Sequence, residues 1–144
     1  MRIGTFNVES LGDAHRQGAP FADRAAVLRP QLDRLKADVL CLQEIDAPKV
    51  GGTRRAVDLG RLLEDTPYAE HSLIVSSGPS GIGAADVHNL AVLTRLRVID
   101  EHTIRHTFVE PLRFQRRTAV PPDADAVPLT WDRPLQHLVL ALPD

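Results

Sequence analysis

Two short strand-like segments, separated by one helical segment, constrain the fold of this chain most. Residues 3–8, Ile-Gly-Thr-Phe-Asn-Val, combine β-branched and aromatic residues in the way that strands do. The unbroken apolar run at 39–42, Val-Leu-Cys-Leu, is typical of a central strand that is covered on both faces. A strand–helix–strand unit favours two parallel neighbouring strands joined by a right-handed crossover. The sequence therefore predicts an α/β fold.

The helix between these strands is predicted to run from Asp23, as its N-cap, to about Lys36. Pro30 falls inside this segment and either kinks the helix or opens the first turn of a restarted one. The apolar stripe of the segment has spacings of four and three and consists of Leu28, Leu32 and Leu35.

The rest of the chain alternates between predicted strands and loops. Gly51-Gly52 predicts a loop, after which Thr53 caps a second helix from Arg54 to Leu63. Further strands are expected at 69–75, 90–94, 98–106 and 137–142, with turns or loops at 9–20, 76–84 and 119–128. Because neither an internal repeat nor a domain boundary is evident, we expect a single domain over residues 1–144.

Composition narrows the classes of function. The formal net charge of -2 argues against a dedicated nucleic-acid scaffold, which usually carries a basic face. It is compatible with an enzyme that acts on phosphate esters, because a bound cation supplies positive charge locally. The single cysteine, Cys41, lies in an apolar run and is expected to be a small buried hydrophobe. We find no membrane-spanning stretch and no signal peptide, and we expect a cytoplasmic protein.

An oxygen-bearing polar side chain lies near the end of each of the first two strands. These residues are Asn7 and Glu44, and ligands collect at the carboxyl ends of strands in an open α/β sheet. Mg²⁺ prefers oxygen ligands, and a carboxylate is costly to bury unless it is paired or bound to metal. Asn7 and Glu44 are therefore candidate ligands of Mg²⁺, with Mn²⁺ as the alternative ion. From the pattern alone, two other roles stay open: Asn7 as a turn-forming residue and Glu44 as a solvated residue at a strand end.

Other polar residues are weaker candidates. His102 and His106 are four residues apart, but the segment between them looks like strand, which does not converge two imidazoles on a zinc ion. His88 either faces the cleft or holds a hydrogen-bonded surface position. Arg133 is a weak candidate for steering an anionic substrate. A basic cluster either contacts a phosphate backbone or faces solvent, and it consists of Arg113, Arg116 and Arg117.

Two segments together resemble the opening of the endonuclease/exonuclease/phosphatase family: Arg-Ile-Gly-Thr-Phe-Asn-Val at 2–8 and Ala-Asp-Val-Leu-Cys-Leu-Gln-Glu at 37–44. Asn-Leu-Ala-Val-Leu-Thr-Arg at 89–95 resembles the family's next core strand, and 131–142 resembles the strand pair that follows. The resemblance implies a DNase I-like four-layer α/β/β/α sandwich. It also implies hydrolysis of phosphate esters in nucleic acids, inositol phosphates or sphingolipids, normally with Mg²⁺. By the same resemblance Glu44 binds the metal and Asn7 lines the metal and phosphate site.

The later motifs of that family are not found in the 144 residues: a His-Leu strand end, a Gly-Asp-x-Asn segment and an Asp-His pair. We therefore expect the chain to be the N-terminal half of the sandwich, truncated and weakly active or inactive alone. Half a sandwich leaves an apolar sheet face uncovered, which predicts self-association or pairing with a C-terminal half. The alternative is a non-catalytic α/β binding module that meets a protein partner through this face.

Overall fold

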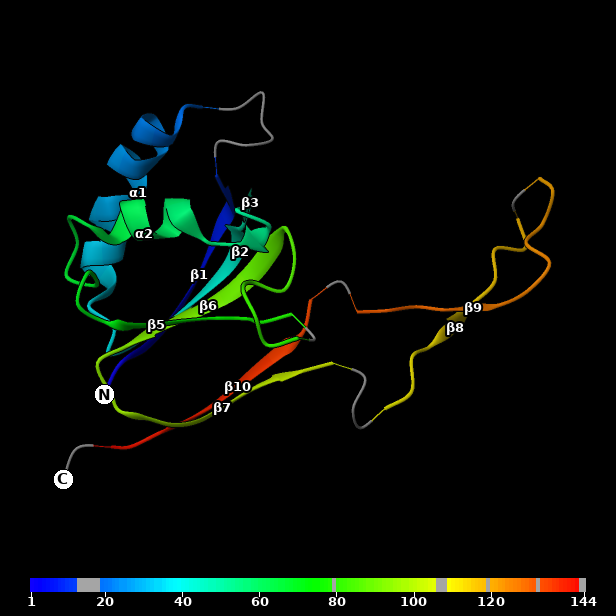
Figure 1. Ribbon diagram of the computed structural model, residues 1–144. Helices are drawn as coiled ribbons and strands as arrows, with labels where there is room; N and C mark the ends of the chain where they lie inside the picture. Colours follow the sequence, from blue (N-terminus) through cyan, green and yellow to red (C-terminus); the bar gives the residue numbers. More distant parts are fainter. Residues whose placement is uncertain (13–18, 79, 106–108, 119, 132, 143–144) are drawn as a thin grey trace.

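The computed structural model describes residues 1–12, 19–78, 80–105, 109–118, 120–131 and 133–142. Its centre is a four-stranded sheet of order β1-β2-β6-β5, formed by Ile3–Leu11, Val39–Asp46, His88–Thr94 and Ser72–Val75. Two helices, α1 (Phe21–Leu35) and α2 (Val57–Leu63), lie on the same side of this sheet (Figure 1). β7 (Val98–Ile104) and β10 (Leu135–Leu140) form a separate antiparallel pair. The fold is thus a layered α/β arrangement.

Two short hairpins complete the described part of the chain. β3 (Lys49–Val50) pairs with β4 (Thr53–Arg54), and β8 (Arg113–Phe114) pairs with β9 (Val127–Pro128). The β8–β9 hairpin projects away from the sheet and helices (Figure 1).

The predicted strand–helix–strand unit is confirmed. β1 and β2 are parallel neighbours, and their register places Phe6 beside Leu42 and Asn7 beside Gln43. β2 also pairs with β6, so it is a central strand as its apolar run indicates. The core lies between this sheet and the helices, and its fully buried members include Leu32, Leu40, Leu42, Leu59, Leu62, Tyr68 and Leu93.

The first helix begins three residues earlier than predicted, with Pro20 at the N-cap position in place of Asp23. Pro20 precedes it in an extended conformation, and the backbone N–H of Asp23 donates to the Pro20 carbonyl. Asp23 therefore lies in the first turn, where the helix dipole favours a negative charge, and it is not the N-cap. The helix ends at Leu35 because Lys36 adopts a left-handed conformation with φ of 44°. Pro30 lies inside the continuous helix.

The second helix is shorter than predicted, and Thr53 does not cap it. The helix begins only at Val57, and Thr53 pairs with Val50 in the β3–β4 hairpin. The two-residue turn of this hairpin is Gly51-Gly52, with φ values of 58° and 84°. Hairpin turns of this kind need positive φ, which glycine adopts without steric cost. A pair of glycines was thus a hairpin signal that outweighed the capping threonine.

Strand boundaries differ in smaller ways. β1 continues to Leu11 where a turn was predicted, and β5 begins at Ser72. The predicted strand at 137–142 lies at 135–140, and β9 falls at the end of the segment predicted to be irregular. The predicted loop at 76–84 is closed by a bridge between Ser77 and Ala84.

The sheet face that points away from the helices is only partly open. Val39 and Val92 lie outside the helix-facing core, yet they are 6% and 7% exposed. Gln136 of β10 donates to the carbonyl of Ile74 in β5, which ties the β7–β10 pair to this sheet. The face is open at the β1 edge, where Ile3 is 64% exposed.

Asp38, which directly precedes β2, is bonded to Arg2 near the start of the chain and to Arg95 just after β6. These bonds give a prediction for stability in acid. The carboxylate accepts the backbone N–H of Arg2 at 2.7 Å and Arg95 Nη2 at 2.9 Å, and these bonds lower the pKa of Asp38 below its ordinary value of 3.8. A lowered folded pKa stabilises the fold above the unfolded pKa, and this contribution is lost as the pH falls through the folded pKa. We expect Asp38→Asn to lower the melting temperature at neutral pH. Melting curves from neutral pH down to about pH 2 should show the difference from the parent chain shrinking. A constant difference would contradict the prediction.

Candidate functional site

A bulge interrupts the pairing of β1 with β2. Asn7 pairs with Gln43 and Leu11 with Ile45, so three residues of β1, at 8–10, stand opposite the single residue Glu44. Glu44 has φ of 61°, and Glu9 and Ser10 each have φ of 52°. A left-handed conformation costs a non-glycine residue roughly 1 kcal/mol or more. Bulges of this kind re-aim side chains and are common beside active sites.

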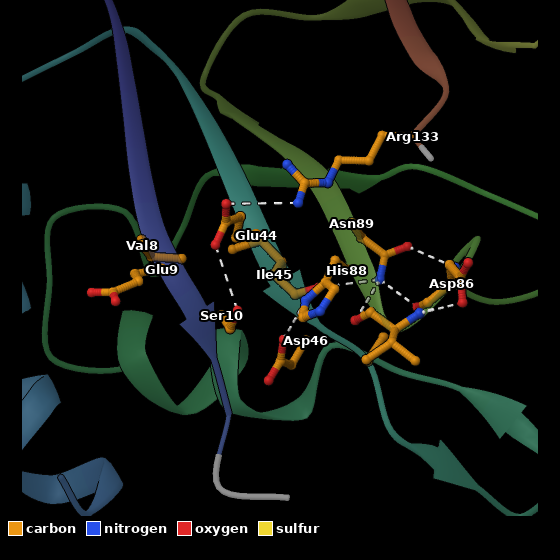
Figure 2. A network of polar contacts seen from close by, with 12 residues as sticks. Val8, Glu9, Ser10, Glu44, Ile45, Asp46, Asp86, His88, Asn89 and Arg133 are labelled. Atoms are coloured by element: carbon orange, nitrogen blue, oxygen red, sulfur yellow. Dashed lines mark hydrogen bonds and ion pairs between the residues drawn. The ribbon is translucent and has the colours of Figure 1, made fainter. Parts of the chain in front are cut away.

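The bulge gathers three polar groups around the Glu44 carboxylate. Asn7 Nδ2 donates to Oε1 at 3.1 Å, and Ser10 Oγ donates to Oε2 at 3.5 Å. Arg133 Nη2 lies 3.6 Å from Oε1, on the opposite side from Ser10 (Figure 2). The hydrogen bond from Asn7, helped by the charge of Arg133, lowers the pKa of Glu44. The side chain is 23% exposed, so an ionised carboxylate faces solvent here.

Asn7 is itself held in one orientation. Its Oδ1 accepts the backbone N–H of Glu9 at 2.8 Å, which leaves Nδ2 to donate to Glu44. The structure therefore brings Asn7 and Glu44 together, as their places on neighbouring strands predicted. In this conformation Asn7 orients the carboxylate through its nitrogen. The role of Asn7 as a ligand through its oxygen stays a prediction.

His88 occupies a hydrogen-bonded position close to Glu44. Its Nδ1 lies 3.0 Å from Asp46 Oδ1, and the imidazole, when protonated, also lowers the pKa of Glu44. Asp46 is 3% exposed, whereas the imidazole is 43% exposed. Gly12 makes room for this carboxylate, because a Cβ there would lie 2.7 Å from Asp46 Oδ2. A buried acid thus orients an accessible imidazole beside the candidate site (Figure 2).

Asn89 is a buried residue whose side chain bonds several backbone groups, and the sequence analysis did not single it out as a site residue. It is fully buried, and its Nδ2 donates to the carbonyls of Ile45 at 3.1 Å and Asp86 at 2.7 Å. Its Oδ1 accepts the backbone N–H of Asp86 at 3.1 Å. The side chain therefore fixes the backbone that follows Glu44. A polar residue inside an apolar strand pattern was the available signal.

The remaining polar candidates lie elsewhere. In the projecting hairpin, Arg113 donates to the carbonyl of Ala126, and Arg116 pairs with Asp123 at 3.2 Å. The predicted basic cluster is thus not brought to Glu44, and Arg117 is exposed. His102 Nε2 lies 2.9 Å from Asp100 Oδ2, and the His102 ring stacks on that of His137. His106 lies outside the described residues.

The residues of the site fit the divalent cation that the resemblance implies. Within the described residues, no three or more His, Cys, Asp or Glu side chains cluster as ligands. Mg²⁺ needs fewer, since it commonly takes one or two carboxylates and fills its shell with water and substrate phosphate. One ionised, partly exposed carboxylate at Glu44 fits this mode of binding. Glu44 is the residue that would hold the ion.

Comparison with protein families decides the class. The family model described as "Endonuclease/Exonuclease/phosphatase family" matches residues 4–142, almost the whole chain. The chain belongs to this family. The endonuclease/exonuclease/phosphatase family has a DNase I-like fold, consistent with the observed sheets and two helices. Its members are phosphoesterase- and nuclease-type hydrolases that generally use divalent metals.

The other comparisons add no relatives. The comparison with curated proteins and that with solved structures each returned no match. Across the described residues, no helix has the length and apolar character needed to cross a membrane.

Proposed function

We propose that this member of the family is a Mg²⁺-dependent hydrolase of phosphate esters, or the N-terminal half of one, with Glu44 as its metal-binding acid. The observation that carries the proposal is the 3.1 Å contact between Asn7 Nδ2 and Glu44 Oε1 across the neighbouring strands β1 and β2. This contact joins the two residues that match the family's N-terminal motifs. Mn²⁺ is the alternative ion, since it shares the preference for oxygen ligands.

Each residue of the site has a distinct part in this proposal. Glu44 binds the cation, and Asn7 fixes the direction of the carboxylate. Arg133 lies 3.6 Å from that carboxylate, so its guanidinium is placed to donate to a phosphate oxygen bound beside Glu44. When bound there, the cation would supply positive charge to offset the charge that develops on the phosphate as water attacks.

The substrate is a nucleic acid or an inositol or lipid phosphate, and the compartment is the cytoplasm. We propose that the 144-residue chain is weakly active or inactive alone, because the family's later motifs are not among its residues. The non-catalytic binding module stays the alternative.

Metal titration separates the two functions. We expect the chain, stripped with EDTA, to bind one Mn²⁺, detected by loss of the free-ion signal in electron paramagnetic resonance. Excess Mg²⁺ should displace the Mn²⁺, because both ions prefer oxygen donors. A binding module predicts no saturable binding of either ion. Hydrolysis of bis(p-nitrophenyl) phosphate, measured with Mg²⁺ and with EDTA, then shows whether the bound ion supports turnover.

We also propose that the chain self-associates through an uncovered apolar sheet face, here the outer side of the β7–β10 pair. The outer side of the β7–β10 pair exposes Leu135 at 58% and Val139 at 37%. Burial of such a face between two copies would remove apolar surface from water. We expect sedimentation velocity to show concentration-dependent association that Val139→Lys weakens. Ile82→Lys, on an exposed loop, is the control. A parent chain that stays monomeric at all concentrations would reject this proposal.

A further inference from the structure

Arg24 reaches from helix α1 to the bulge that carries the candidate site. Its Nη1 donates to the carbonyl of Ser10 at 2.8 Å, and its Nη2 donates to the carbonyl of Glu9 at 3.0 Å. Nη2 also donates to the carbonyl of Val8. One half-buried side chain thus binds three successive carbonyls of β1.

These three carbonyls belong to residues 8–10, the extra residues of the bulge in β1. Residues 8–10 face the single residue Glu44, so the regular ladder with β2 is interrupted along them. Carbonyl groups that leave a ladder near a protein interior need other donors. A guanidinium offers five N–H groups in a planar fork, whereas an ammonium is a compact point charge. An arginine is therefore suited to hold this bulge in a way that a lysine is not.

The conformation of the bulge in turn places both β1 partners of Glu44. The backbone N–H of Glu9 binds Asn7 Oδ1 at 2.8 Å, which turns Asn7 Nδ2 toward Glu44. The next residue, Ser10, presents its hydroxyl to Glu44 Oε2 at 3.5 Å. Glu9 and Ser10 both have left-handed φ of 52°, a conformation that external contacts must sustain.

We propose that Arg24 is a positioning residue for the Glu44 site. It holds residues 8–10 in the strained bulge, and the bulge orients Asn7 and Ser10 on the carboxylate. Arg24 acts through these residues and does not touch the ion or the phosphate. The effect on metal binding rests on the proposed function of Glu44, whereas the effect on Asn7 does not.

The same helix offers a matched control. Arg29, also on α1, donates its Nε to the carbonyl of Leu62 at 3.1 Å and its Nη2 to that of Arg61 at 2.8 Å. It therefore makes the same type of contact, but to helix α2 and away from Glu44. If weaker Mn²⁺ binding results only from the loss of contacts that hold α1 in place, it should appear in Arg29→Gln as well as in Arg24→Gln.

The experiment has two readouts on the parent chain, Arg24→Gln and Arg29→Gln. The first is the Kd for Mn²⁺, which we expect to rise about tenfold in Arg24→Gln only, as losses of outer-shell partners do. The second is the NMR signal pair of the Asn7 side-chain amide. The chain has only two asparagines, Asn7 and Asn89, so Asn89 serves as an internal reference. We expect the Asn7 signals to move in Arg24→Gln and to stay in place in Arg29→Gln.

Unchanged Asn7 signals and an unchanged Kd in Arg24→Gln would overturn the inference, as would equal changes in both variants. If Arg24→Gln does not fold, Arg24→Lys decides, since it keeps the charge and loses the fork. It should shift the Asn7 signals and weaken Mn²⁺ binding, and parent-like values would reject the role. If Glu44→Gln binds Mn²⁺ like the parent, the proposed function fails, and the Asn7 signals still test Arg24.

Discussion

Replacement of Glu44 by glutamine is expected to weaken Mn²⁺ binding by about 100-fold or more, because loss of an outer-shell partner already costs roughly 10–100-fold. The variant keeps the size of the side chain and an oxygen acceptor, so the contact with Asn7 survives, but the negative charge that attracts a hard cation is gone. Titration by electron paramagnetic resonance measures the effect. If the whole protein turns over phosphodiesters, the rate with Mg²⁺ should fall with it.

A second acid, at the end of helix α2, supplies the control for this experiment. Glu64 follows helix α2 and is exposed, so Glu64→Gln removes the same charge from the chain without touching the bulge. We expect it to bind Mn²⁺ with the parent Kd. A Glu44→Gln variant that is as tight as Glu64→Gln would place the cation, if one binds, somewhere other than Glu44.

Replacement of Asn89 by alanine is expected to lower the free energy of unfolding by about 3 kcal/mol, because each buried group left without its hydrogen bond costs roughly 1–3 kcal/mol. The side chain is fully buried, and its amide binds backbone groups of Ile45 and Asp86. Alanine would leave those groups without this partner inside the protein, with a small cavity in addition. Urea denaturation followed by circular dichroism measures the loss.

Asp86→Asn is the control for that measurement. The contacts between Asn89 and Asp86 involve the Asp86 backbone and not its side chain. The Asp86 side chain accepts the backbone N–H of Val87, which asparagine can also accept, and makes an ion pair of 3.8 Å with Arg54 at the surface. Exposed pairs of this kind contribute roughly 0–1 kcal/mol. An Asn89→Ala variant no less stable than Asp86→Asn would mean that the buried network does not stabilise the fold.

The order of the main elements could be predicted because it depends on short-range patterns. The apolar run at 39–42 has no polar position for solvent, so a central strand followed, and the stripe of Leu28, Leu32 and Leu35 specified the helix that covers it. The boundaries of the helices and strands were harder to predict. Whether Thr53 caps a helix or pairs in a hairpin depends on how the Gly51-Gly52 turn fits its neighbours, and both outcomes satisfy local propensity.

The candidate site was predictable in its residues and not in its geometry. Asn7 and Glu44 could be placed close together because they lie on parallel neighbouring strands joined by one helix, although β1 continues past Asn7 to Leu11. The bulge at 8–10 could not be predicted, because Val-Glu-Ser contains no glycine that would indicate positive φ. Its conformation is stabilised by Arg24, and this contact arises only once α1 packs on the sheet.

Arg133 and His88 illustrate the same limit. Arg133 lies 89 positions after Glu44 in the sequence, and only the return of the chain toward β10 brings it to 3.6 Å. His88 was left open between a cleft and a surface position, and its partner Asp46 had no distinguishing pattern beyond following Glu44. Contacts between residues so far apart depend on topology, which local pattern does not encode.

The most direct test of a cation at Glu44 is paramagnetic broadening by Mn²⁺ in the NMR spectrum of the intact chain. At a small fraction of one equivalent, the Asn7 side-chain amide signals should broaden first, because Asn7 Nδ2 lies 3.1 Å from the Glu44 carboxylate. The signals of β8 and β9, which project away from the sheet, should stay sharp at that ratio. Uniform broadening along the chain, or broadening centred on other acids with Asn7 unaffected, would contradict a metal site at Glu44.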